Sequence, residues 1–75
     1  MDWIVSDPGV LGGKPCVRGT RISVEFVLEA LASGATPESI AATYAGVPVD
    51  AVQEALRYAA RGMKSDAFWN LDLAR

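Results

Sequence analysis

The 75-residue chain contains no histidine and only one cysteine, and these absences exclude several kinds of site. One cysteine cannot form a disulfide within the chain, and the usual zinc ligand sets need more histidine and cysteine than are present. Without histidine, the chain also lacks the side chain that most often acts as a base near neutral pH. We therefore expect no catalytic residue, no metal and no cofactor. Cys16 is interpreted as a small hydrophobic residue in preference to a reactive thiol.

Long hydrophobic runs are also absent, although 51% of the residues are apolar. A membrane-spanning helix needs about 20 consecutive apolar residues, and no cationic start followed by an apolar stretch indicates a secretory signal. We therefore expect a cytoplasmic protein. A single domain of this size buries only about 60% of the surface that its unfolded chain exposes. Additional burial is therefore expected from a homodimer or a hetero-oligomer with a protein partner.

Positive charge is scarce, and much of it lies in one segment. Residues 12–22 contain three cations and no acidic residue, whereas the whole chain has a net charge of −2. We expect this segment to present its cations to an anionic partner, either phosphate or the carboxylates of another protein. The alternative is local pairing with Glu25 or Glu29, which contributes only about 0–1 kcal/mol when exposed. The candidate DNA-binding residues of the segment are Lys14, Arg18, Thr20 and Arg21.

Two short β-prone regions precede the helical part of the chain. Residues 3–5 form an apolar run that ends at the turn residues Asp7-Pro8-Gly9, and we expect an edge strand there. Residues 15–17 and 20–22 flank Arg18-Gly19. Because glycine supplies the positive φ of tight turns, these two flanks are predicted to form a hairpin.

The spacing of apolar residues predicts three helices, and hence a mainly α protein. The first covers residues 24–33 after Ser23 as N-cap, and the second covers residues 37–45 after Thr36, with proline at its first position. The third covers residues 49–61. Two helices joined by a tight glycine turn favour a helix-turn-helix. The predicted inward-facing residues of the third helix are Val49, Val52, Leu56, Ala59 and Ala60.

The third helix also carries a polar stripe of Asp50, Glu54, Arg57 and Arg61. In a helix-turn-helix this would be the recognition helix, so Arg57 and Arg61 are candidates for DNA contact. The two acidic residues on the same stripe repel phosphate, and a solvated face paired within the helix is the favoured alternative. Because the net charge is unlike that of basic DNA-binding modules, DNA binding would require a dimer.

Residues 63–75 are predicted to form an extended arm that follows a domain of residues 1–62. Large apolar and polar residues alternate in the arm, and a period of two is typical of a strand. The arm either folds back on the strand at residues 3–5 or adds to a partner protein as an extended strand. We favour the partner. The candidate partner-binding residues are Lys64, Phe68, Trp69, Leu71, Leu73 and Arg75.

The run Gly13-Lys14-Pro15, followed by Gly19-Thr20-Arg21-Ile22 and an apolar helix, closely resembles the family catalogued as domain of unknown function 433. The resemblance implies a small three-helix, homeodomain-like core. It also implies an antitoxin of a type II toxin–antitoxin pair, which binds a PIN-like ribonuclease toxin and autoregulates its operon as a DNA-binding dimer. The alternative is a stand-alone dimeric DNA-binding transcriptional regulator.

The resemblance also suggests how the arm would inhibit such a nuclease. A PIN-like nuclease holds a divalent metal with clustered carboxylates. A cation near or on the arm, namely Arg61, Lys64 or Arg75, is therefore hypothesised to pair with those acids and displace the metal. Neither a membrane nor a small-molecule substrate is expected as a partner.

Overall fold

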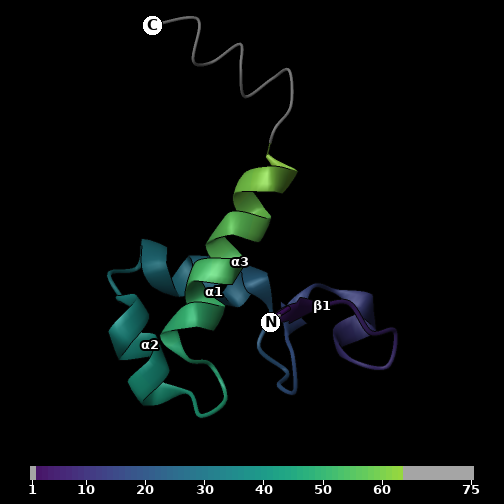
Figure 1. Cartoon of the computed structure of the whole chain (residues 1–75), viewed down its shortest axis with the longest axis horizontal. Coiled ribbons are helices and arrows are strands. Elements are labelled where there is room, and N and C mark those ends of the chain that lie inside the picture. The colour runs from purple at the N-terminus through teal and green to yellow at the C-terminus, as the bar shows by residue number, and fades with distance from the viewer. Residues whose placement is uncertain (1, 64–75) are drawn as a thin grey trace, which may run out of the picture.

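The computed structural model describes residues 2–63 of the chain and shows three helices preceded by a short pair of strands (Figure 1). In chain order the elements are β1 (Ile4–Val5), the 3-10 turn η1 (Leu11–Gly13), β2 (Cys16–Val17), α1 (Val24–Ala32), α2 (Pro37–Thr43) and α3 (Val49–Gly62). The predicted fold class, a mainly α protein with a three-helix core and N-terminal strands, is confirmed. The arm predicted for residues 63–75 lies outside the described residues, except for Met63.

The strands pair differently from the predicted hairpin. β2 pairs with β1 in an antiparallel register that places Ile4 opposite Val17 and Val5 opposite Cys16. The turn about Arg18-Gly19 is present, and the Val17 N–H donates to the Ile22 carbonyl oxygen across it at 2.8 Å. Residues 20–22 are nevertheless not a strand, and the next residue, Ser23, forms an isolated bridge with Cys16. Cys16 and Val17 are both buried. β2 is thus the inner strand, with β1 on one side and the returning chain on the other.

The cap residues predicted from the sequence determine where α1 and α2 begin. The Ser23 side chain accepts a hydrogen bond of 2.9 Å from the Phe26 N–H. Thr36 and Ser39 form a reciprocal capping box at the start of α2, which satisfies two N–H groups that the helix leaves unpaired. At the start of α3, Pro48 makes no side-chain cap. α3 is therefore held mainly by packing.

The core lies where α3 crosses α1, α2 and β1. Its buried residues are Val17, Val24, Val27, Ile40, Val47, Ala51, Val52 and Ala55. The predicted inward face of α3 is therefore wrong in part, because Leu56 is 42% exposed and Ala60 is also exposed. The small side chains of Ala51 and Ala55 turn inward instead and let the helices approach closely.

The C-terminal half of α3 extends beyond the rest of the domain (Figure 1). From residue 56 to residue 63 every side chain except Ala59 is exposed. This part of the helix leads directly into the residues predicted to form the arm. Within residues 2–63, no helix combines the length and apolar character that crossing a membrane requires.

Candidate binding surfaces

The basic segment contains a tight loop at residues 18–21 that is organised by Thr20. Its hydroxyl donates to the Val17 carbonyl at 2.8 Å and accepts from the Ile22 N–H at 3.0 Å. Gly19 has φ +78°, a conformation that glycine adopts without steric cost. The Thr20 hydroxyl, a predicted DNA contact, is half-buried and gives its only proton to this loop. The two hydrogen bonds of this hydroxyl shape the loop that presents Arg18 and Arg21.

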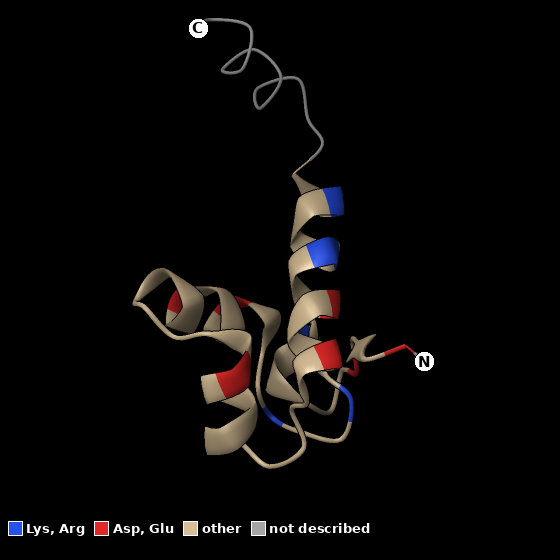
Figure 2. Cartoon of the chain, turned by 60° about the vertical axis from the view of Figure 1, so that its left-hand side comes forward, with Lys and Arg blue, Asp and Glu red and all other residues tan. Residues whose placement is uncertain are grey.

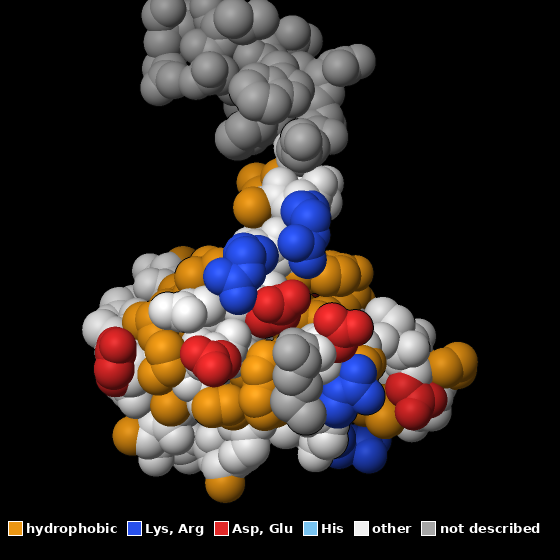
Figure 3. Space-filling view, viewed as in Figure 1, with side chains coloured by type: hydrophobic (Ala, Val, Ile, Leu, Met, Phe, Trp, Pro, Cys, Tyr) orange, Lys and Arg blue, Asp and Glu red, His pale blue; other side chains and the backbone are white. Residues whose placement is uncertain are grey.

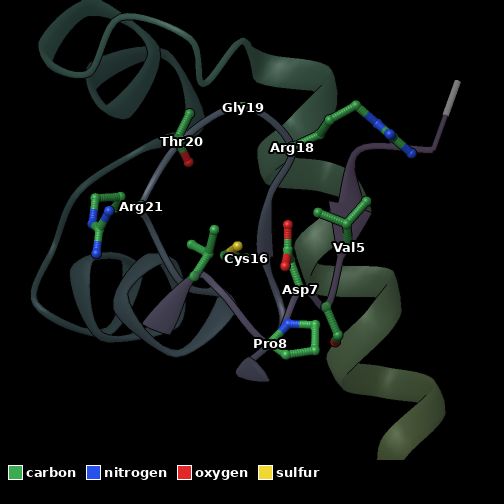
Figure 4. Close-up of a pocket in the computed structure, with 10 residues that line it drawn as sticks. Val5, Asp7, Pro8, Cys16, Arg18, Gly19, Thr20 and Arg21 are labelled. Atoms are coloured by element: carbon green, nitrogen blue, oxygen red, sulfur yellow. The ribbon is translucent and has the colours of Figure 1, made fainter. Parts of the chain in front are cut away.

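The two arginines of the loop point in different directions (Figure 4). The Arg18 side chain donates from Nε to the Asp2 carbonyl oxygen at 2.8 Å, which holds it beside the N-terminal strand. Arg21 lies on the other side of the loop. No acidic side chain in residues 2–63 is within ion-pair distance of Arg21. The predicted basic surface is thus divided between two sides of the loop.

An open pocket of about 680 Å³ lies beneath the loop and is lined by both arginines and by Val5, Asp7 and Cys16 (Figure 4). The Asp7 carboxylate accepts a hydrogen bond from the Gly9 N–H at 2.9 Å. Its negative charge opposes the binding of a phosphate in this pocket. The structure therefore favours anion binding on the outer side of the loop, where Arg21 lies.

On that outer side, Lys14 and Arg21 line a second pocket of about 310 Å³ together with Phe26 and Tyr44. The two aromatic rings meet edge to face with centroids 5.4 Å apart. Lys14 is also 3.4 Å from Glu25 in an ion pair whose two side chains are mostly exposed. Neither aromatic residue was predicted from the sequence to belong to a site. The position of Phe26 between the inward residues Val24 and Val27 was the available signal.

The arginines of α3 are paired within the helix. Arg57 lies 3.0 Å and Arg61 lies 4.0 Å from the Glu54 carboxylate, whose side chain is only 24% exposed. Figure 2 shows the acidic residues in the N-terminal half of α3 and the basic residues in the C-terminal half. The intrahelical pairing that the spacing favoured is present. It competes with phosphate for both arginines.

Exposed apolar side chains lie on the same helix. Leu56, Tyr58 and Met63 are 42%, 40% and 56% exposed, and hydrophobic side chains are visible around the projecting part of α3 in Figure 3. The sequence pattern predicted Leu56 to be in the core and did not single out Tyr58 or Met63. Leu56 and Met63 lie on one flank of the helix, whereas Tyr58 lies on the opposite flank. Large exposed side chains that lie together, as Leu56 and Met63 do, are typical of a surface that binds another molecule.

The remaining predicted sites can be placed only in part. The six candidate partner-binding residues of the arm, Lys64, Phe68, Trp69, Leu71, Leu73 and Arg75, all lie outside the described residues. Within residues 2–63, no three side chains of aspartate, glutamate or cysteine cluster as ligands for a metal ion.

Comparison with known proteins gives two matches. The model of a family described as "protein of unknown function (DUF433)" matches residues 4–59. The crystal structure of a DUF433 member protein from Anabaena variabilis is similar over 100% of this chain and 71% of its own, with a TM-score of 0.75 and 25% sequence identity. No curated protein matches the chain.

Proposed function

The chain belongs to the DUF433 family, and from that premise we propose that it is the antitoxin of a type II toxin–antitoxin pair. In this role it binds a PIN-like ribonuclease toxin and prevents RNA cleavage. One observation carries the proposal. α3 projects from the domain with Leu56, Tyr58 and Met63 exposed, and the large apolar residues Phe68, Trp69, Leu71 and Leu73 follow it in the sequence.

The proposal rests on the free-energy cost of leaving exposed apolar side chains in water. Burying a large apolar side chain stabilises a complex by about 1.5–3 kcal/mol relative to full exposure. Phe68, Trp69, Leu71 and Leu73 follow α3 within a few residues. A partner that covers the arm and the exposed end of α3 together would gain several such contributions. Aromatic residues of this kind dominate the binding energy at protein interfaces.

An autoregulatory role in DNA binding is the second part of the proposal. The loop at residues 18–21 packs on the turn between α2 and α3, because a Cβ on Gly46 would lie 3.2 Å from Thr20 Cγ2. Arg21, the residue after Thr20, thus lies close to the turn that leads into the helix in the recognition position. This arrangement supports phosphate contacts from the loop. A stand-alone dimeric transcriptional regulator would use the same surface.

The test separates the two surfaces with matched variants. The tagged full-length chain is purified from its host, co-purifying proteins are identified, and any nuclease among them is assayed for RNA cleavage with and without the chain. In the arm variant, Phe68, Trp69, Leu71 and Leu73 become alanine. In the loop variant, Lys14, Arg18 and Arg21 become alanine.

If the chain is an antitoxin, the arm variant loses nuclease inhibition and the loop variant keeps it. The loop variant should instead lose operator DNA binding, with a smaller dependence of affinity on salt. If no nuclease is recovered, and the wild-type chain binds DNA alone, the transcriptional regulator replaces the antitoxin. If the recovered nuclease cleaves RNA equally well with the chain present, the antitoxin proposal is wrong.

A further inference from the structure

The pocket on the outer side of the basic loop brings together cations and aromatic rings from segments that are distant in the sequence. Lys14 follows η1, Arg21 lies in the loop, Phe26 lies in the first turn of α1, and Tyr44 caps the C-terminal end of α2. No acidic residue lines this pocket, whereas Asp7 lines the larger one. Its charge therefore favours an anionic ligand.

Both cations of the pocket can pair with a phosphate. Arg21 has no acidic side chain within ion-pair distance among residues 2–63, and its planar guanidinium group can hold two phosphate oxygens at once. Lys14 pairs with Glu25 at 3.4 Å, but both side chains are mostly exposed. Because an exposed ion pair is weak, Lys14 can exchange Glu25 for a phosphate at little cost.

The aromatic rings give the pocket a second kind of surface. Phe26 is 42% exposed, and its ring meets the Tyr44 ring at an interplanar angle of 90°. A flat group that lies against one ring therefore meets the other ring at a right angle, so the two rings bound it on two sides. Nucleobases are flat groups of this kind and stack on phenylalanine and tyrosine in many nucleic-acid complexes.

The backbone beside Lys14 is strained. Within residues 2–63, Leu11 is the only residue other than glycine with a positive φ, at +52°, a conformation that a Cβ disfavours. Leu11 lines the same pocket. Its carbonyl oxygen accepts a hydrogen bond of 3.3 Å from the Lys14 N–H, which closes the turn that precedes Lys14. Strain of this kind is concentrated at functional sites, and here it fixes one of the two cations.

We propose that this pocket binds one unstacked nucleotide of a single-stranded nucleic acid. The base lies against Phe26 and Tyr44, and the adjoining phosphates pair with Arg21 and Lys14. Aromatic side chains flanked by cations are the usual means of binding single strands. In a duplex the bases are stacked on one another and do not reach the rings. The inference therefore goes beyond the phosphate contacts with operator DNA proposed above, and it does not rest on a nuclease partner.

The first experiment compares probes on the wild-type, full-length chain by fluorescence anisotropy. The probes are labelled oligothymidylate, labelled oligouridylate and an abasic strand of the same length, which keeps the phosphates but lacks the bases. At least one oligonucleotide should bind about fivefold or more tightly than the abasic strand, and the better of the two identifies DNA or RNA as the ligand. Equal affinity for the abasic strand, or no binding of either oligonucleotide, would overturn the proposal.

The second experiment removes the ring and keeps both cations. Phe26→Leu should weaken oligonucleotide binding at least about fivefold and leave binding of the abasic strand unchanged. Tyr58→Leu is the matched control, because Tyr58 is 40% exposed and does not line this pocket. Equal affinities of Phe26→Leu and wild type, or equal weakening by both variants, would contradict the stacking. If Phe26→Leu fails to fold by circular dichroism, the abasic comparison on wild type decides the matter.

The phosphate contacts are tested with the same probes. Arg21→Gln should weaken the binding of all three strands and reduce its dependence on salt. Glu25→Gln should strengthen it, because the acid that competes for Lys14 is removed. Unchanged binding by Arg21→Gln would overturn the assigned site.

Duplex DNA from upstream of the chain's own gene separates this inference from the proposed operator binding. Phe26→Leu should bind the duplex as wild type does. A chain that binds the duplex but no single strand would refute the nucleotide site and leave the autoregulatory role standing. A chain that binds single strands through Phe26 but not the duplex would do the reverse.

Discussion

Gly46→Ala tests how the turn between α2 and α3 supports the basic loop. Gly46 has φ +89°, in the left-handed region, where a residue with a Cβ is destabilised by about 1–2 kcal/mol. The new Cβ would also lie 3.2 Å from Thr20 Cγ2, which is closer than the optimal carbon separation of about 3.5–4.0 Å. Either the loop or the turn must therefore move by a few tenths of an ångström.

Gly34→Ala provides the matched control. Gly34 has φ +106°, and a Cβ there would meet nothing within 4 Å, so this variant carries the backbone cost alone. We expect Gly34→Ala to lower the free energy of unfolding by about 1 kcal/mol and Gly46→Ala by about 2 kcal/mol. In thermal unfolding, each kcal/mol corresponds to a fall in Tm of about 4–8 °C for a domain of this size.

Urea unfolding followed by circular dichroism measures both changes. The slope against urea should stay constant, because a shift of a few tenths of an ångström leaves the surface exposed on unfolding nearly the same. A Gly46→Ala chain as stable as Gly34→Ala would show that the contact with Thr20 costs nothing. A Gly46→Ala chain as stable as wild type would refute the strain argument itself.

Three further predictions concern caps, ion pairs and the thiol. Ser23→Ala removes the hydrogen bond to the Phe26 N–H and should lower the free energy of unfolding by about 1 kcal/mol. Pro48→Ser should raise the Tm, because it supplies the side-chain cap that α3 lacks. Equal Tm values for Ser23→Ala and wild type would contradict the predicted role of the Ser23 cap. Glu25→Gln should change the free energy of urea unfolding by less than about 1 kcal/mol, because its pair with Lys14 is exposed; a larger loss would mean that this pair is structural. Cys16 is 1% exposed, so a thiol reagent should modify it only as fast as the domain opens, and rapid labelling of the native chain would count against that burial.

The sequence was sufficient to predict those features that depend on interactions between residues close together in the chain. Ser23 and Thr36 predicted the starts of α1 and α2 because their hydroxyls bond to N–H groups only two or three residues away. Gly34 and Gly46 marked the ends of α1 and α2 because glycine tolerates positive φ. The pairing of Arg57 and Arg61 with Glu54 likewise follows from helical spacing alone.

The candidate sites were harder to predict because they depend on residues that are distant along the chain. Arg18 and Arg21 are three residues apart and both line the first pocket, but the loop directs their side chains to different sides, and only Arg21 also joins Lys14 beside Phe26 and Tyr44. No sequence pattern shows which of three cations share a pocket. That depends on how the strands, the loop and α1 pack together.

The sequence by itself therefore determined the number of helices, their caps and the basic character of residues 12–22, since each follows from interactions within a few residues. The tertiary structure decided that Ala51 and Ala55 enter the core and that Leu56 does not. Leucine is the more hydrophobic residue, yet at the positions of Ala51 and Ala55 the close crossing of α3 with α1 and α2 leaves space only for small side chains. The same crossing leaves the Leu56 side chain 42% exposed.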